Sequence, residues 1–495
     1  MSKPNTTLAK NISVLMGSQV ITWLLTMVLM IFLPRYLGAA NIGKLHLAIS
    51  LWVIMSVVMG FGMDMLIAKE VAREPEEVST LFGTRIVVGS LLFVLCTALL
   101  LLFLYIFNYP IVTIYVVAII GIEYWIWQFV GATEAVLQGR EKMEYISFGR
   151  IIGHCANVAI SITLLLLGWG IFVIACVRIF AAAVVFGVQF ANLRQLFSLR
   201  LQVNYSLALH LLRSGWPYFL ASISLVVYMQ LDVVIMSFLV TEEAIGWYGV
   251  ADQLFGTLLF IPTAFITSIY PVFSRLFVNE DEPLKALMSK SFDAMYLLSV
   301  PIGLGLFLIA KPLVTLLYGT EFIPSGPVLA VFGIVLILTY LNMLIGQFLI
   351  SIDRQRAWAM VMAAATLATI PLDLWLIPWT EANWANGAIG GAIAFVITEM
   401  GMLLSGVFLL PKGTLGLANV WTALRTTICG LVMLGIAWLF RDHLIAIPIL
   451  VGAFVYGGMI LLLGVIPKDD IASLWGFVQN VQRRFVQREV ITVNQ

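Results

Sequence analysis

Long apolar runs separated by short polar connections fill almost the whole chain of 495 residues. A helix needs about 20 predominantly apolar residues to cross a bilayer, and runs of that length recur along the sequence. Fourteen expected spans lie at residues 11–33, 45–68, 85–107, 111–133, 146–168, 170–190, 213–239, 247–271, 291–310, 326–350, 357–378, 386–410, 421–440 and 445–466. The pattern therefore predicts an all-α membrane protein with fourteen transmembrane helices.

Lysine and arginine residues fall mainly on one side of this pattern. When each is assigned to its nearest connection, 22 lie at the N-terminus, in even-numbered connections or in the C-terminal tail, and Arg85 is counted with the second connection. Arg178 is the exception inside a span. The four on the other side are Arg35, Lys44, Lys311 and Arg441. Because basic residues concentrate in cytoplasmic loops, we expect a multi-pass protein of the cytoplasmic (inner) membrane with both termini in the cytoplasm.

Two connections resemble each other at an offset of 203 residues. The stretch LPRYLGAANIGKLHLAIS covers residues 33–50, SFLVTEEAIGWYGVADQL covers 237–254, and Gly43 aligns with Gly246. Each stretch is expected to connect the first and second spans of a six-helix unit, so the two units would form parallel repeats. The expected parts are a first lobe, a second lobe, and a final helix pair with a cytoplasmic tail, at residues 1–198, 199–412 and 413–495.

Composition agrees with a membrane protein and excludes several classes of function. Hydrophobic residues make up 61% of the chain and charged residues 11%, whereas soluble domains carry about 25% charged residues. A net charge of +1 argues against a nucleic-acid-binding surface. The four cysteines lie inside apolar runs, so we expect neither a disulfide framework nor a metal site.

The connections also argue against catalysis. Membrane glycosyltransferases and polysaccharide polymerases generally hold their chemistry in large external loops, and the outward connections here are short. No glycine-rich nucleotide-binding loop with a lysine occurs in the sequence. We therefore expect a transporter that is not an enzyme and that uses no cofactor other than a coupling H⁺ or Na⁺.

A polar stripe in the fifth expected span is the first candidate binding surface. Arg150, His154, Asn157 and Ser161 are spaced i, i+4, i+7 and i+11, which puts them on one face of a helix. Arginine offers two parallel donors to an anion such as a diphosphate. The alternative is that Arg150 reaches the cytoplasmic interface and His154 bonds to a neighbouring helix.

Two charged residues lie deeper in the expected spans. Arg178 is in the middle of the sixth span, where it must face water or pair with an acid. Glu123, Trp127, Gly131 and Glu134 share one face of the fourth span. Arg178 is expected in a substrate-binding cavity, or else in a structural pair with Glu123 or Glu134. Glu123 is also a candidate for a protonatable coupling site.

Acidic residues dominate the interior of the second half. Tyr228 and Asp232 are four residues apart in the seventh span, and further carboxyls lie in the eighth, eleventh and twelfth spans at Asp252, Asp373 and Glu399. Buried carboxyls without bases bind a cation or carry a proton. They are candidates for coupling, and the alternative is that they lock neighbouring helices together.

Several motifs then point to a family. The stretch GFGMDMLIAKEVAR covers residues 60–73, and the pattern that begins at Gly215 and Pro217 continues through Asp232 to a Gly-x-Tyr-x-x-Ala turn at residues 246–251. The chain thus resembles the polysaccharide-biosynthesis branch of the multidrug/oligosaccharidyl-lipid/polysaccharide (MOP) transporter superfamily over its first twelve expected spans.

This resemblance implies a two-lobed flippase with a central cavity. Its substrate would be a polyprenyl-diphosphate-linked oligosaccharide such as an O-antigen or exopolysaccharide repeat unit, moved by alternating access. Expected partners are that substrate, membrane lipid, and a polysaccharide polymerase or glycosyltransferases, with the chain itself a monomer. The alternatives are a cation-coupled multidrug exporter and a flippase for peptidoglycan precursors, followed by a membrane polysaccharide polymerase.

Overall fold

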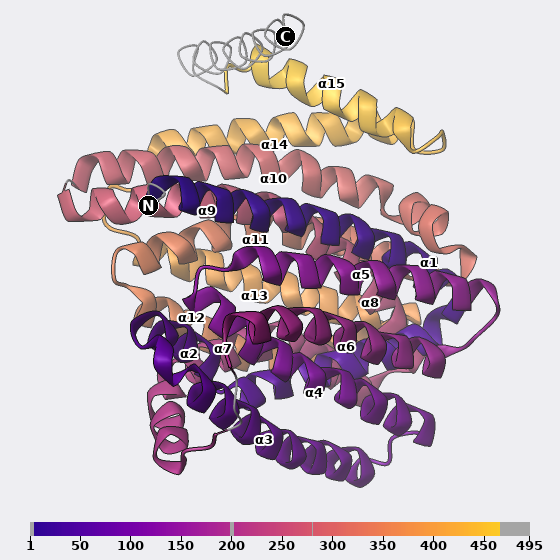
Figure 1. Ribbon diagram of the computed structural model, residues 1–495. Coiled ribbons are helices and arrows are strands. Elements are labelled where there is room, and N and C mark those ends of the chain that lie inside the picture. The colour runs from indigo at the N-terminus through magenta and orange to yellow at the C-terminus, as the bar shows by residue number, and fades with distance from the viewer. Residues whose placement is uncertain (1–3, 199–201, 280, 466–495) are drawn as a thin grey trace, which may run out of the picture. The chain divides into compact units, whose positions relative to one another are not determined.

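The computed structural model describes residues 4–198, 202–279 and 281–465, and throughout these ranges the chain is helical, without strands (Figure 1). The helices are α1 (Pro4–Gly60), α2 (Met63–Arg73), α3 (Val78–Ile106), α4 (Ile111–Gly139), α5 (Met143–Leu166), α6 (Ile171–Leu196), α7 (Tyr205–Leu239), α8 (Glu242–Leu258), α9 (Phe260–Asn279), α10 (Asp281–Tyr318), α11 (Ser325–Ser351), α12 (Gln355–Trp384), α13 (Gly387–Leu409), α14 (Leu417–Trp438) and α15 (Ala446–Leu462). Short 3₁₀ turns lie at Pro75–Glu77 and Thr320–Phe322.

Twelve helical segments of the described chain are long and apolar enough to cross a membrane. One of them, Gly17–Arg73, is 57 residues long and contains the expected spans 11–33 and 45–68 almost entirely. At 1.5 Å per residue it is far longer than the bilayer core of about 30 Å. The last helix, α15, has 17 residues and is shorter than the other candidates. The all-α membrane fold is thus as predicted, and the count of fourteen spans stays a prediction.

The first expected connection differs from the structure. Residues 33–50 were expected to join two helices, but α1 runs through them and is interrupted at Gly38 alone, with φ 77° and ψ 167°. This backbone conformation is open to glycine and strained for other residues. The corresponding break in the second stretch is the two-residue gap Val240–Thr241 between α7 and α8. A single glycine can therefore redirect the chain where a loop was expected.

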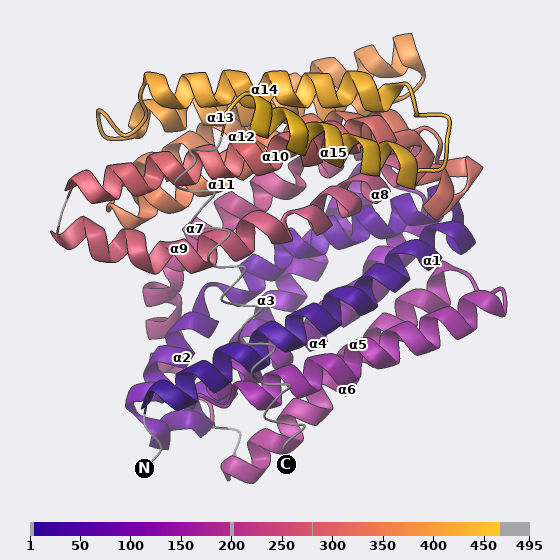
Figure 2. The same cartoon turned by 90° about the horizontal axis from the view of Figure 1, so that it is seen from above.

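The described chain divides into two compact units. Of the described residues, the first unit contains those within 4–257, 313–331 and 356–402, and the second contains those within 258–312, 332–355 and 403–465. In the first unit α5 packs between α1 and α6 (Figure 2), and α6 also packs against α4. Each unit combines separate segments of the chain, whereas the lobes expected at 1–198 and 199–412 are continuous. The expected lobes stay a prediction.

The two similar stretches touch each other within the first unit. A Cβ atom on Gly43 would overlap the carbonyl oxygen of Glu242, and a Cβ atom on Gly246 would overlap the carbonyl oxygen of Ala39. Since Glu242 is the counterpart of Ala39 at the offset of 203, the contact is reciprocal. The same offset pairs Gly249 with His46, whose ring it contacts. We call this contact the glycine seam.

Polar contacts surround the glycine seam. Lys44 forms an ion pair with Glu242 at 3.0 Å, and Thr113 donates a hydrogen bond to the same carboxylate. The backbone N–H of Ala39 donates to Glu321 Oε1 at 2.6 Å. Charges that were expected to lie in exposed connections are thus engaged with partners far away in the sequence.

The second unit is built around α10. Gly303 of α10 and Gly333 of α11 let these two helices approach closely, because a Cβ on either would overlap the carbonyl oxygen of the other. Val300 forms a buried cluster with Cys429 of α14 and Tyr456 of α15, and the Tyr456 hydroxyl donates to the carbonyl of Leu297 at 2.7 Å. The final two helices thus pack on α10 inside one unit.

Candidate functional site

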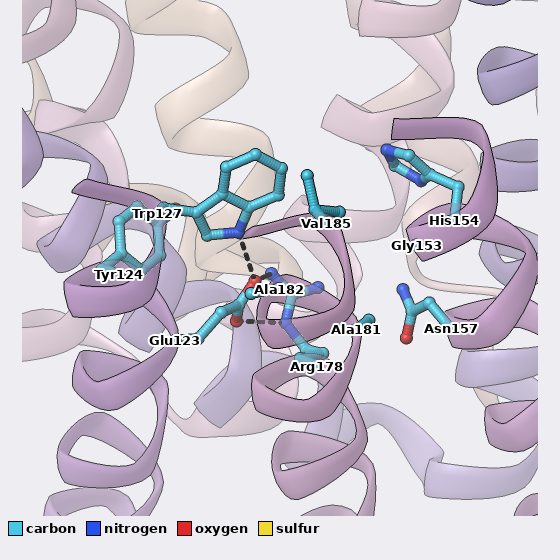
Figure 3. A pocket seen from close by; sticks show the side chains of 10 residues that line it. All are labelled: Glu123, Tyr124, Trp127, Gly153, His154, Asn157, Arg178, Ala181, Ala182 and Val185. Carbon is cyan, nitrogen blue, oxygen red and sulfur yellow. Dashed lines mark hydrogen bonds and ion pairs between the residues drawn. The ribbon is translucent and has the colours of Figure 1, made fainter. Parts of the chain in front are cut away.

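A cavity of about 280 Å³ lies between α4, α5 and α6 in the first unit (Figure 3). One wall comes from α4, one from α5 and one from α6. Its lining residues are Glu123, Tyr124, Trp127, Gly153, His154, Asn157, Arg178, Ala181, Ala182 and Val185. Gly153 lets α5 pack closely against α6 beside the cavity, since a Cβ there would overlap Val185.

An ion pair forms the floor of this cavity. Arg178 donates through Nε to Glu123 Oε2 at 2.7 Å and through Nη2 to Glu123 Oε1 at 3.0 Å. The indole N–H of Trp127 donates to Glu123 Oε1 at 3.3 Å. The carboxylate side chain is 7% exposed and the guanidinium side chain 24% exposed, so the arginine is the more accessible partner. Of the two acids that were predicted as partners for Arg178, the structure selects Glu123.

The polar stripe of α5 is divided between two places. His154 and Asn157 line the cavity opposite Trp127, and Ser161 donates to Asn157 Oδ1 at 3.3 Å (Figure 3). Arg150 does not line the cavity. Its Nε and Nη2 atoms donate to Glu134 at 2.8 and 2.6 Å. The helical face predicted for these residues exists, but Arg150 at its N-terminal end is engaged by Glu134 of α4.

Glu134 is held from two sides. Besides Arg150, the side-chain amide of Gln189 on α6 donates to Glu134 Oε1 at 2.9 Å. The carboxylate is nearly buried, at 9% side-chain exposure, whereas Arg150 is 42% exposed. A buried charge needs such partners because burial without them is costly. The pair therefore fastens α4, α5 and α6 together beside the cavity.

A third ion pair was not anticipated from the sequence. Arg85, counted with a cytoplasmic connection, is 1% exposed inside α3. It donates to Asp64 of α2 at 2.7 and 3.3 Å and to Gln128 of α4 at 3.1 Å. The sequence contained one indication of this pair: Asp64 is a carboxylate within the expected span 45–68, and a charged residue there requires a partner.

The acidic residues of the second half come together on α7, α8 and α12. Tyr248 donates to Asp232 Oδ2 at 3.0 Å. Asp373 is fully buried and lies against Asp232, and neither of its oxygens has a donor among the described residues. Asp252 follows Tyr248 by one turn on α8. Two carboxyls in contact cannot both remain ionised without a proton or cation between them.

Glu399 lies on α13 and belongs to the same unit. It accepts a hydrogen bond from the hydroxyl of Tyr228 at 2.9 Å, and its side chain is buried. Within the described ranges, no group of three or more His, Cys, Asp or Glu residues has the arrangement of a metal site. These four acids were predicted as coupling or structural residues, and that assignment stays a prediction.

Comparisons with known proteins agree with this picture. A family described as polysaccharide biosynthesis protein matches residues 8–277, which is more than half of the chain. The resemblance was expected over the first twelve spans, and this match ends before the ninth expected span begins at residue 291. The probable low-salt glycan biosynthesis flippase Agl15 of Haloferax volcanii is 23% identical over 172 residues. That match covers 34% of this chain and 35% of the relative, so only about a third of the relative's length is spanned.

Two solved structures share the fold. The inward closed lipid II flippase MurJ superposes with a TM-score of 0.73 and 15% identity, covering 92% of this chain and 98% of the other. An inward-facing multidrug resistance MATE family transporter of the MOP superfamily gives a TM-score of 0.66 at 15% identity, covering 78% and 94%. The chain therefore has the fold of MOP-superfamily transporters.

Proposed function

This chain belongs to the polysaccharide biosynthesis protein family, as its motifs predicted, and from that premise we propose that it is a flippase for lipid-linked oligosaccharide. The substrate is a polyprenyl-diphosphate-linked repeat unit, which crosses the cytoplasmic membrane by alternating access. The observation that carries the proposal is the polar cavity between α4, α5 and α6, enclosed by helices apolar enough to span a bilayer. Relatives named a glycan biosynthesis flippase and a lipid II flippase support it.

Alternating access requires two parts that move against each other. We place them in two parallel six-helix repeats, with the last two helices appended. The glycine seam supports this arrangement, because Gly43 and Gly246 meet reciprocally at the offset of 203 that relates the repeats. Both termini are cytoplasmic in this proposal, and the protein acts as a monomer beside glycosyltransferases or a polysaccharide polymerase.

The substrate contacts the side chains predicted for the cavity. Arg178, Glu123, His154 and Asn157 present polar atoms there, and Arg150 reinforces the same helices through Glu134. The ion pair lets a polar surface persist inside the membrane, because each charge is compensated where it is buried. The lipid tail stays in the bilayer, so only the polar part of the substrate enters.

We assign coupling to the acids on α7 and α12. Asp232 and Asp373 are in contact, and no basic side chain pairs with them among the described residues, which supports the uptake of one H⁺ or Na⁺. Asp252 and Glu399 lie in the same unit and supply further carboxyls. Binding and release of that ion would make the two transport states unequal in energy, as coupling requires.

The function is tested by flipping of a labelled lipid-linked oligosaccharide in proteoliposomes. Arg178→Ala should abolish flipping while the protein still inserts and purifies, since Glu123 is then left buried without its partner. Arg178→Lys should retain little activity if the two-point contact matters. Arg194→Ala is the matched control, because that residue is exposed at the end of the same helix. Unchanged flipping by Arg178→Ala would remove the cavity from the mechanism.

The same vesicles test the alternatives. A multidrug exporter recognises cationic drugs, which favours a binding cavity lined by acids without bases, whereas in the cavity between α4, α5 and α6 Glu123 is compensated by Arg178. Accumulation of a cationic dye without flipping of any glycan lipid would favour the exporter. Flipping of a peptidoglycan precursor alone would favour that narrower substrate.

A further inference from the structure

We propose that the cavity between α4, α5 and α6 binds a neutral sugar unit of the translocated lipid rather than its diphosphate. This inference rests on the proposed function, because it names which part of the lipid-linked oligosaccharide the cavity holds. The charge balance, the aromatic wall and the free polar atoms of the cavity lead to it.

The charges that line the cavity cancel. Glu123 and Arg178 are joined by two hydrogen bonds, and the lining includes no lysine and no second arginine. A diphosphate would bring negative charge next to the carboxylate of Glu123, where repulsion is strong because little water intervenes. To bind Arg178 it would have to displace Glu123 and leave that carboxylate buried and unpaired. Arg150 cannot help, since Glu134 holds it outside the cavity.

Aromatic rings form the α4 wall. The indole of Trp127 lies over the ion pair, fixed by its N–H bond to Glu123 (Figure 3). Tyr124 stacks on Trp52, with ring centroids 6.2 Å apart and an interplanar angle of 20°. A sugar ring has a face of C–H groups that packs on such a ring, whereas a diphosphate has none. The wall therefore suits a pyranose.

Polar atoms face this wall from α5. Asn157 uses its oxygen for Ser161, and its amide N–H groups have no partner among the described residues. The imidazole of His154 likewise has none in the described ranges. Sugar hydroxyls donate and accept, so one can donate to Glu123 while another accepts from Asn157. Phosphate oxygens only accept, so a diphosphate adds no hydrogen bond to the carboxylate of Glu123 beyond those from Arg178 and Trp127.

The cavity volume fits one ring. At about 280 Å³ it lies just below the range of about 300–1,000 Å³ typical of small-molecule sites. A single monosaccharide fills such a space, and the remaining sugars must lie outside it. Volume alone would also admit a diphosphate, so the choice between them depends on charge and on the aromatic wall.

The binding test uses the purified full-length protein in detergent. Its unfolding temperature is measured with a panel of free hexoses, deoxyhexoses and N-acetylhexosamines, and with inorganic diphosphate at equal concentration. We expect at least one sugar to stabilise the protein and diphosphate not to do so. Stabilisation by diphosphate alone, or by no sugar of the panel, would overturn the assignment.

Variants separate binding from folding. Trp127→Ala should weaken binding of the stabilising sugar about tenfold, and Trp127→Phe should retain most of it because the ring face remains. Trp125→Ala is the matched control, since Trp125 donates to Ser90 at 3.2 Å and does not line the cavity. Equal loss in Trp125→Ala and Trp127→Ala would contradict a sugar platform.

Charge removal gives an independent readout. Glu123→Gln leaves Arg178 without a counter-charge, so inorganic diphosphate should begin to bind and stabilise this variant. Absence of that gain would contradict the charge argument. Transport distinguishes this inference from the proposed function. If the protein flips the glycan lipid but its cavity binds diphosphate and no sugar, the proposed function holds and this inference is wrong. Sugar binding without flipping of any glycan lipid would support this inference and contradict the proposed function.

Discussion

Buried charges are handled in different ways by α2–α6 and by α7, α8 and α12. In the first group three arginines are each paired with one acid, in the pairs Arg85–Asp64, Arg150–Glu134 and Arg178–Glu123. In the second group Asp232 and Asp373 lie together, and the hydroxyl of Tyr248 donates to Asp232. A closed ion pair keeps its charges in every conformation, whereas a carboxyl pair needs an exchangeable proton or cation. Under the proposed coupling, the first group keeps a constant charge and the second changes its charge during transport.

The largest effect is expected from opening a closed pair. Asp64→Ala leaves Arg85 buried at 1% exposure without its counter-charge, so the free energy of unfolding should fall by about 3 kcal/mol. Thermal and denaturant unfolding in detergent measure it. Glu70→Ala on the same helix is the control, and adding Arg85→Leu to Asp64→Ala should recover part of the loss. Wild-type stability in Asp64→Ala would mean that the pair contributes nothing.

A smaller effect is expected from removing the donor of the acidic group. Tyr248→Phe deletes the hydroxyl that donates to Asp232 and should cost about 1 kcal/mol of unfolding free energy. The same variant should change the dependence of flipping on an imposed H⁺ or Na⁺ gradient, because Asp232 then relies on the bound ion for a partner. Unchanged gradient dependence would separate Tyr248 from coupling.

The smallest change in stability is expected at Asp373. Asp373→Asn imitates a protonated carboxyl, and the native side chain has no donor to lose, so the unfolding free energy should change by less than about 1 kcal/mol. Flipping should nevertheless lose its response to the gradient. A loss of stability as large as that of Asp64→Ala would contradict the contrast between the two groups of helices.

Helix-level features could be predicted from the sequence because apolar length and periodicity are local properties. The 3.6-residue period correctly put His154 and Asn157 on one face of α5, where both reach the cavity. It also limited the partners of Arg178 to Glu123 or Glu134. The choice between these two acids depends on which helices are neighbours, and the sequence does not state that.

Two features of the structure, the burial of Arg85 and the helix break at Gly38, were not predicted from the sequence for similar reasons. Arg85 begins an apolar run, so its burial could not be told from exposure at the membrane surface until α2 and α4 were placed around it. Gly38 is one glycine among many, and its positive φ, which ends one straight helix and begins another, is a property of the folded backbone. In both cases the deciding contact comes from residues distant in sequence.

The glycine seam also has a consequence for how this chain can change over evolutionary time. Residue 43 is small because of residue 242, and residue 246 is small because of residue 39, so each copy is constrained by the other. Contact between equivalent surfaces is the form taken by an interface between two identical subunits around a two-fold axis. In this chain each glycine faces a backbone carbonyl oxygen, which no change of side chain removes, so both positions should remain glycine among descendants.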